Sequence, residues 1–332
     1  MKHTKERNGR LLIDILLIII GFVILIKGAD LLVKAAISIA KRFGISEMLI
    51  GLTILAIGTS LPEIFITVSS AIDNRSDLII GNTIGSCICN FLLVIGITSL
   101  IKKIKFDKRI IKRHLPIGIV AMILLLLLGN IQKFGDAQKI TRGDGIALLL
   151  CLTAYIIYSV YEEKKIHNNK IDKELIKEVK SKENYSIITI IIYIILGVLG
   201  LKFGADFVVE NSVLIANKLG LTEKFIGMTI IAIGTTLPEI TTSIISARKD
   251  ETDLLLGNIS GSNIINLLLL IGLGAVINPL AFSADFNMSI ITLIIVTIFL
   301  QIITTINKKN ELDWKRGIIL IIMYIIYICS MI

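Results

Sequence analysis

Long apolar segments, separated by short charged loops, dominate this chain. A segment of about 20 apolar residues is long enough to cross the hydrocarbon core of a bilayer as a helix, and such segments recur throughout the 332 residues. Hydrophobic residues make up 54% of the chain and charged residues only 18%, which is too little polar surface for a water-soluble domain. The segments are long and rich in Ile and Leu, unlike the short alternating strands of a membrane barrel. The sequence therefore predicts an all-α membrane protein.

The lengths of the segments predict about ten transmembrane helices. We expect them at residues 11–43, 46–72, 77–100, 114–130, 143–160, 186–218, 222–247, 253–274, 287–306 and 316–331. The first and sixth are too long to stand upright, so they should be strongly tilted or extend past the bilayer. No small-residue cleavage site follows the basic residues 1–10, so we interpret them as mature chain and not as a signal peptide.

The second half of the chain repeats the first. A shift of 176 places DLIIGNTIGSCICNFLLVIG (77–96) on DLLLGNISGSNIINLLLLIG (253–272), with roughly half of the paired residues identical. Each half holds five expected spans, and two odd halves must insert in opposite directions, so the sequence predicts two inverted-topology repeats. The predicted units are a first five-helix repeat at 1–160 with its motif at 56–96, a charged linker at 161–185, and a second repeat at 186–332 with its motif at 232–272. This architecture is typical of alternating-access transport.

Basic residues in the loops predict the orientation. The loops around 41–47, 102–113, 162–184, 248–253 and 307–316 hold about 22 Lys and Arg, against about 10 on the other side, so that side should be cytoplasmic. In the cell membrane, both termini are then expected on the extracellular side and the linker on the cytoplasmic side. The basic N-terminal tail opposes this assignment. The net charge of +9 comes mostly from these basic loop residues, which determine the orientation in the membrane. We therefore expect no nucleic-acid partner.

The stretch IGTSLPEI at 57–64 recurs as IGTTLPEI at 233–240. Each copy places a proline and a glutamate inside an apolar span. Pro62 and Pro238 cannot donate to the carbonyl four residues earlier, and an unpaired carbonyl is costly in hydrocarbon unless another group, such as a cation, binds it. Intramembrane carboxylates are rare and indicate function by default.

Other polar residues share a helix face with these glutamates. Thr59 lies four residues before Glu63 and Ser60 three residues before it, so all three project from one side of a helix. Ser86 and Asn90 repeat the four-residue spacing in the next span, and the second half supplies counterparts. The candidate ligands are therefore Thr59, Ser60, Glu63, Ser86, Asn90, Thr235, Thr236, Glu239, Ser262 and Asn266.

Carboxylate, amide, hydroxyl and carbonyl oxygens are the ligands that hard cations such as Ca²⁺ prefer. Two glutamates carry a charge of −2, which balances one Ca²⁺ or two monovalent cations. An empty, doubly ionised site is costly to move through a low-dielectric barrier, which favours exchange over leak. Each feature alone has a simpler explanation, because prolines kink helices and hydroxyls bond back to their own helix. The recurrence of the whole set favours an ion site.

The sequences AIGTSLPEIFITVSSAI…DLIIGNTIGSCICN and AIGTTLPEITTSIISAR…DLLLGNISGSNIIN resemble the two alpha repeats of the cation/calcium antiporter superfamily, and within it the prokaryotic sodium/calcium exchangers. The resemblance spans nearly the whole chain. It implies electrogenic exchange of one Ca²⁺ for about three Na⁺. It also implies that the first and sixth helices slide as a unit against the other eight.

The resemblance also implies a role for each candidate residue. Glu63 and Glu239 would be central ligands for both ions, Thr59 and Thr235 would add ligands for calcium, Asn90 and Asn266 would face the middle of the site, and Ser60, Thr236, Ser86, Ser262 and the carbonyls of Ala56 and Ala232 would line flanking sodium sites.

Two positions depart from the family pattern. Some relatives, including the potassium-dependent branch, carry Asp where this chain has Asn266, so we expect a potassium-independent protein with two site carboxylates. Cys87 stands where the second repeat has Asn263. In the long first and sixth helices, Lys27 with Asp30 and Lys202 with Asp206 are expected to form pairs that set helix tilt.

Three rival functions remain open at this stage. A calcium/proton exchanger would use the same two carboxylates, and a cation channel would need a ring of oxygens around an axis. An enzyme is the most distant alternative, because no histidine lies near the repeats. We expect Ca²⁺ and Na⁺ as substrates, a lipid bilayer as surroundings, no cofactor, no catalytic residues, four inert cysteines and a functional monomer.

Overall fold

The structure, a computed structural model, describes residues 2–131, 138–169, 185–220, 232–306 and 310–331. Helices account for most of them. In chain order the elements are α1 (Lys2–Phe43), α2 (Glu47–Ile50), η1 (Gly51–Leu55), α3 (Ala56–Thr59), α4 (Leu61–Ile72), α5 (Ser76–Cys89), η2 (Asn90–Val94), α6 (Ile95–Ile101), β1 (Ile104–Lys105), η3 (Ile110–His114), α7 (Leu115–Asn130), β2 (Lys139–Ile140), α8 (Arg142–Asn169), α10 (Ile187–Lys218), α12 (Ala232–Thr235), α13 (Leu237–Arg248), α14 (Thr252–Ile265), η5 (Asn266–Leu270), α15 (Ile271–Ile277), β3 (Leu280–Ala281), α16 (Asp285–Ile306), β4 (Glu311–Leu312) and α17 (Trp314–Met331), where η marks a π-helical turn.

Apolar helices long enough to span a bilayer make up most of the described chain. Seven qualify by length and composition, and the segments Glu47–Thr59 and Leu61–Ile72 form an eighth candidate that is bent by 49°. Of the ten expected spans, 222–247 lies partly outside the described residues, and 316–331 corresponds to α17. The all-α membrane fold is therefore confirmed, and α8 continues as a helix into the expected linker as far as Asn169.

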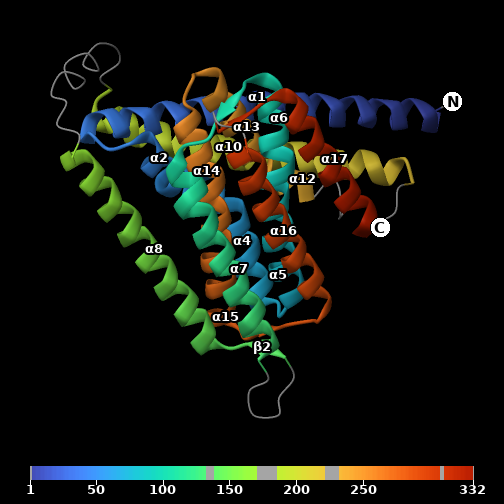
Figure 1. Ribbon diagram of the computed structural model, residues 1–332. Coiled ribbons are helices and arrows are strands. Elements are labelled where there is room, and N and C mark those ends of the chain that lie inside the picture. The colour runs from blue at the N-terminus through green and yellow to red at the C-terminus, as the bar shows by residue number, and fades with distance from the viewer. Residues whose placement is uncertain (1, 132–137, 170–184, 221–231, 307–309, 332) are drawn as a thin grey trace.

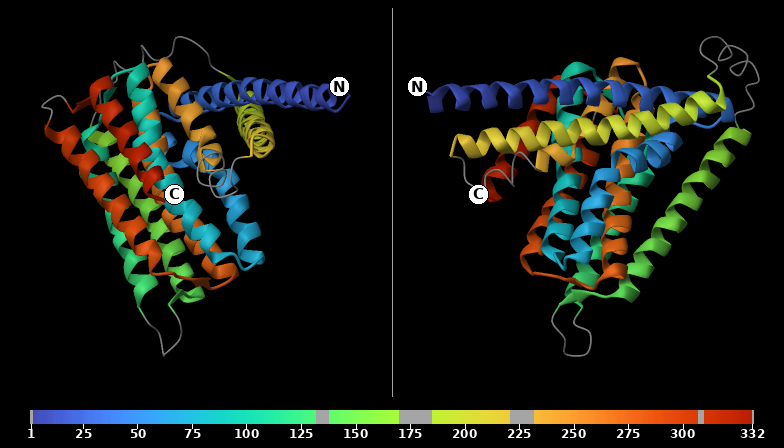
Figure 2. Two further views of the ribbon diagram at one scale, coloured as in Figure 1. Left: turned by 90° about the vertical axis from the view of Figure 1, so that its right-hand side faces the viewer. Right: turned by 180° about the vertical axis from the view of Figure 1, so that it is seen from behind.

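Two directions of helix packing organise the molecule. Helices α4, α5, α7, α14 and α16 run along one another as a bundle, whereas α1 and α10 lie side by side across it (Figure 1). The views from the side and from behind show the same arrangement (Figure 2). Strong tilt was expected for the spans 11–43 and 186–218, and the corresponding helices α1 and α10 have 42 and 32 residues, more than an upright helix needs to cross a bilayer.

Glycines let α1 and α10 approach each other closely. A Cβ atom at Gly28 would lie 2.7 Å from the backbone nitrogen of Leu201, and one at Gly204 would lie 2.6 Å from that of Leu25. Gly21 meets Gly204 while Gly28 meets Gly197, so the two helices run antiparallel. Small residues at such crossings allow the backbone-to-backbone packing that associates helices in lipid.

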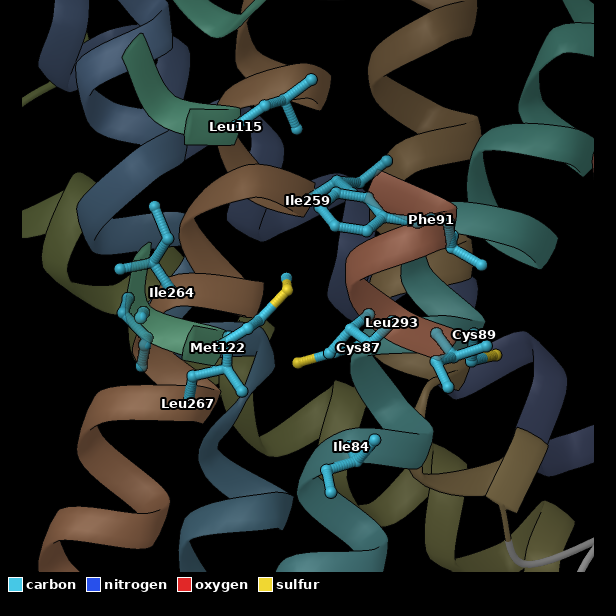
Figure 3. Close-up of a cluster of buried hydrophobic side chains, with 14 of the residues drawn as sticks. Ile84, Cys87, Cys89, Phe91, Leu115, Met122, Ile259, Ile264, Leu267 and Leu293 are labelled. Atoms are coloured by element: carbon cyan, nitrogen blue, oxygen red, sulfur yellow. The ribbon is translucent and has the colours of Figure 1, made fainter. Parts of the chain in front are cut away.

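The buried apolar side chains form two clusters. The larger fills the bundle, and Figure 3 shows Cys87 and Met122 pointing from different helices into its interior. The smaller lies mainly between α1 and α10 and includes Leu25, Leu32 and Leu201. Separate clusters indicate that α1 and α10 pack against the bundle as a distinct pair.

Polar contacts gather several loops at one end of the bundle, which we call the basic end (loops around 102–109, 162–163, 248–253 and 310–316). Ion pairs join Lys102 to Asp250 and Arg109 to Glu163, and β1 pairs antiparallel with β4. Burial raises the pKa of Asp107 there, but its hydrogen bonds with Arg109 outweigh this effect and hold the pKa below the ordinary value. These are loops that the sequence placed on one side of the membrane.

The other sheet, β2 paired with β3, lies at the opposite end of the bundle (Figure 1). There Asn278 donates to Asn74, next to the end of α4. The expected pairing of Lys27 with Asp30 is wrong, because Asp30 forms ion pairs with Lys34 at 3.0 Å and with Lys249 at 2.8 Å. The second of these ties α1 to the end of α13. Lys202 and Asp206 do pair, at 2.7 Å.

We expect Gly204→Val to destabilise the protein by about 1–3 kcal/mol, because the new side chain would meet the backbone of α1 and force the two helices apart. Thermal unfolding of the purified protein in detergent measures this. Gly81→Val is the matched control, since a Cβ there meets only Phe286, at 3.8 Å. Equal melting temperatures for the two variants would contradict the close packing of α1 on α10.

Candidate cation-binding site

Two helices break in the middle of the bundle, at equivalent positions of the two halves. The chain leaves helical geometry at Ser60 (φ −83°, ψ 6°) and at Thr236 (φ −90°, ψ 0°). Pro62 and Pro238 then occupy the first turn of the following helices, where a missing N–H removes no helical hydrogen bond. The prolines therefore begin new helices in the membrane interior and do more than kink a continuous one.

The two glutamates lie in the first turns of these new helices. Glu63 is in the first turn of α4 and Glu239 in that of α13, and both side chains are 0% exposed. Unpaired backbone N–H groups at a helix N-terminus favour a negative charge nearby. The two carboxylates are close enough to repel each other. The break thus places two charged groups together and partly compensates each one.

The next span of each half carries a π-helical turn at the same place. Asn90 begins η2 and Asn266 begins η5, and both side chains are fully buried. One extra residue in a turn rotates the helix locally, and such turns occur frequently at functional sites. Ser86 and Ser262 lie one turn earlier, in α5 and α14, and both are buried.

Hydrogen bonds join the polar residues of one half to those of the other. The hydroxyl of Ser60 donates to Glu239 Oε1 at 3.4 Å. The hydroxyl of Thr59 lies 3.2 Å from Asn258 Oδ1 and 3.4 Å from Ser262 Oγ. Thr236 is buried and donates to Cys89 Sγ at 3.2 Å, and Thr235 is buried beside it. The site is therefore assembled from both halves, and neither half forms it alone.

Several buried oxygens of the site have no hydrogen-bond partner within the described residues. They are Glu63 Oε1 and Oε2, Glu239 Oε2, Ser86 Oγ, Asn90 Oδ1 and Asn266 Oδ1. A buried polar atom without a partner costs about 1–3 kcal/mol, and more if it is charged. Such a concentration of unpaired oxygens fits ligands for a hard cation. Within the described part of the chain no group of three or more His, Cys, Asp and Glu side chains could hold a metal ion.

The predicted backbone ligands are the carbonyls of Ala56 and Ala232, and the structure describes the surroundings of the first in more detail than those of the second. The carbonyl of Ala56 accepts the N–H of Ser60 at 3.0 Å and the hydroxyl of Thr59 at 3.3 Å. Ala232 begins α12, and its side chain lies outside the described residues. In that half Thr236 donates its N–H to Ile233 at 3.1 Å. The Ala56 carbonyl thus belongs to the hydrogen-bond network that closes α3.

Sequence reasoning missed Asn258, which is fully buried and connects the halves by accepting from Thr59 and donating to Thr242 Oγ1 at 3.2 Å. The signal was available, because Asn258, Ser262 and Asn266 follow at four-residue intervals on one helix face. Buried hydroxyls also continue from each glutamate along the same helix face, at intervals of four and then three residues. They are Thr67 and Ser70 on α4 and Ser243 and Ser246 on α13.

A bundle of apolar, membrane-spanning helices with broken helices and a buried cluster of unpaired oxygens is an arrangement typical of ion-transporting membrane proteins. The profile of one family, "Sodium/calcium exchanger protein", matches residues 13–161 and again 189–332. The chain belongs to this sodium/calcium exchanger family. The matched ranges cover both halves of the internal repeat.

Relatives of known name and structure agree with this assignment. The chain is 36% identical to the putative antiporter CaxA of Alkalimonas amylolytica, over 96% of this chain and 98% of that protein. It is 28% identical to the sodium/calcium exchanger MaX1 of Methanosarcina acetivorans, over 95% and 97% respectively. The sodium-calcium exchanger NCX_Mj, soaked with zero Na⁺ and Ca²⁺, superimposes with a TM-score of 0.78 at 28% identity and covers 97% of this chain and 100% of that one.

We expect Glu63→Gln and Glu239→Gln each to abolish calcium binding while the protein still folds. Glutamine keeps the volume and one oxygen of glutamate but removes the charge that sets affinity for a divalent cation. Isothermal titration calorimetry of the purified variants measures binding, and thermal unfolding reports the fold. Glu210→Gln, an exposed position on α10, is the control. Calcium affinity close to that of the unmodified protein in both site variants would place the site elsewhere.

Proposed function

We propose that this protein is a secondary antiporter that exchanges Ca²⁺ for Na⁺ across the cell membrane by alternating access. The observation that carries the proposal is the set of buried, unpaired oxygens around Glu63 and Glu239. Oxygens that lack partners within the protein are available to replace the hydration shell of a cation. Membership of the sodium/calcium exchanger family supports this choice of ions.

The proposed ligands are the predicted ones. Glu63 and Glu239 bind either ion, and Thr59 and Thr235 complete the calcium site. Asn90 and Asn266 face its middle. The flanking sodium sites use Ser60, Ser86, Thr236, Ser262 and the carbonyls of Ala56 and Ala232. The cross-contacts from Ser60 to Glu239 and from Thr59 to Ser262 support a site shared between the halves.

The proposed stoichiometry is about three Na⁺ for one Ca²⁺, as the family resemblance implies. Two glutamates carry −2, so the calcium-loaded site is neutral, whereas three sodium ions leave it with one positive charge. Exchange is then electrogenic. Potassium is not required, because Asn266 supplies an amide where the potassium-dependent relatives carry a third carboxylate.

Two inverted repeats of five helices account for the arrangement. Segments that correspond by the shift of 176 support this, since β1 (104–105) pairs at the basic end and its counterpart β3 (280–281) pairs at the opposite end. Equivalent helices α1 and α10 run antiparallel. In this proposal the repeats are 1–160 and 186–332, joined by the linker 161–185, and α1 with α10 slides as a unit against the bundle.

The proposed orientation places the basic end and the linker in the cytoplasm and both termini outside, in a protein that works as a monomer. The ion pairs Lys102–Asp250, Arg113–Glu162 and Arg109–Glu163 support a single side for these loops. Basic loops are retained on the cytoplasmic side during insertion.

We expect proteoliposomes loaded with Na⁺ to take up radioactive Ca²⁺ when diluted into sodium-free buffer. Uptake should require internal Na⁺ and persist without K⁺. Uptake should also increase when the interior of the vesicles is made electrically positive, because each exchange cycle carries one net positive charge out. This dependence tests electrogenicity. Empty liposomes and Glu239→Gln proteoliposomes are the controls.

Each alternative function predicts a different result in the same vesicles. Uptake driven by a pH gradient with no sodium present would assign the counter-ion role to protons. Ca²⁺ flux that needs no counter-ion, with single-channel currents in planar bilayers, would indicate a channel. Loss of uptake on removal of K⁺ alone would overturn the potassium-independent proposal.

A further inference from the structure

Cys87 and Asn263 occupy equivalent positions, 176 residues apart, and they contact each other where the two halves meet. The amide nitrogen of Asn263 donates to the backbone carbonyl of Cys87 at 3.1 Å. In return the thiol of Cys87 lies 3.6 Å from the backbone carbonyl of Asn263. Because the two positions are equivalent in the repeat and each side chain contacts the other's backbone carbonyl, two identical residues could make both contacts alike. The chain instead carries a cysteine at one position and an asparagine at the other.

The side chain of Asn263 fixes the orientation of Asn90. A backbone carbonyl only accepts hydrogen bonds, so Asn263 must turn its NH₂ group toward Cys87 and its Oδ1 the other way. That oxygen accepts from Asn90 Nδ2 at 2.9 Å. The remaining polar atom of Asn90, its Oδ1, has no partner among the described residues. The contact therefore leaves the carbonyl oxygen of Asn90, and not its amide hydrogens, for a cation.

The other half lacks this arrangement. By the shift of 176, Asn266 corresponds to Asn90, and its orienting partner would be the side chain at position 87. A cysteine there offers only a weak donor and a weak acceptor, and its thiol is directed to the Asn263 carbonyl. Neither Asn266 Nδ2 nor Asn266 Oδ1 has a hydrogen-bond partner within the described residues, although the side chain is fully buried.

We propose that Asn263 is a positioning residue that holds the oxygen of Asn90 toward the transported cations, and that Cys87 removes the equivalent support from Asn266. The two halves of the site are then unequal. Asn90 is a fixed ligand, whereas Asn266 turns about its side-chain bonds and presents its oxygen only when a cation draws it in. The inference rests on the proposed function, because it concerns ligands of the same site.

Ordering a ligand only on binding costs conformational entropy, which a ligand held in advance does not. The outer partners of metal ligands contribute about 10–100-fold to metal affinity for this reason. Breaking the contact to Asn90 should therefore weaken binding, and building one to Asn266 should strengthen it. If the two residues are exchanged, the orienting hydrogen bond should pass from Asn90 to Asn266. The cation affinity should then stay the same, because one of the two amides is still held in advance.

Three variants of the full chain test this against the unmodified protein, with Ca²⁺ affinity measured by calorimetry. Asn263→Cys should lower the affinity about tenfold. Cys87→Asn should raise it by a similar factor, about tenfold. The double variant, Cys87→Asn with Asn263→Cys, should return to within about twofold of the unmodified protein. Cys151→Asn, the same substitution at an exposed cysteine of α8, should change nothing.

The rescue separates positioning from packing. If Asn263 only fills space, the double variant will bind no better than Asn263→Cys, and the proposal is wrong. Unchanged affinity in Asn263→Cys also overturns it. Thermal unfolding without cations identifies any variant that fails to fold.

The same proteins are then titrated with Na⁺, because a fixed carbonyl oxygen favours any hard cation. The same order of affinities is expected. If the unmodified protein binds Na⁺ but not Ca²⁺, the proposed exchange of calcium fails while the order for Na⁺ still decides the role of Asn263. If the unmodified protein binds neither cation, both proposals fail.

Discussion

The carboxylates of Glu63 and Glu239 lie fully buried in a membrane-spanning bundle, and neither pairs with a basic side chain in the described part of the chain. A buried charge without a partner is among the most costly features that a fold can contain. The broken helices offset part of this cost, because each carboxylate lies at the start of a helix, where backbone N–H groups stabilise a negative charge. The hydroxyls and amides around them supply oxygens, which suit a cation but repel a second anion. A cation bound between the two carboxylates would remove this cost, and under the proposed function that requirement connects the backbone breaks to transport.

The close packing of α1 on α10 complements the polar site. Glycines at this crossing bring the two backbones into direct contact, and the apolar cluster between the two helices is separate from that of the bundle. Such close packing associates helices in lipid, so it holds α1 and α10 together as one unit, as the proposed movement of the pair against the bundle requires. The ion pair between Asp30 and Lys249 is one polar contact that a displacement of α1 along α13 would have to break.

Most of the fold could be predicted because hydrophobic length and the repeat are properties of the sequence itself. The expected spans 77–100 and 186–218 agree with the helices within a few residues. The sequence identified Pro62 as a residue that leaves a helix carbonyl unpaired, but it did not predict the break, since a proline alone does not distinguish a kink from a new helix beginning at Leu61. Asn258 was missed because the four-residue spacing was not followed one turn further. The contact of Cys87 with Asn263 depends on how the halves dock, and no spacing within either half specifies it.

The substitution at position 87 bears on how one site serves two ions. Ca²⁺ accepts six to eight oxygens in flexible geometry, whereas several Na⁺ ions must share the same oxygens at different places. A site made only of fixed ligands suits one of these loads better than the other. With Asn90 held by Asn263 and Asn266 left without a partner, one amide defines the position of the ions and the other adjusts to their number. Under the proposed function, the loss of symmetry at Cys87 is a means by which a nearly symmetric protein accommodates both loads.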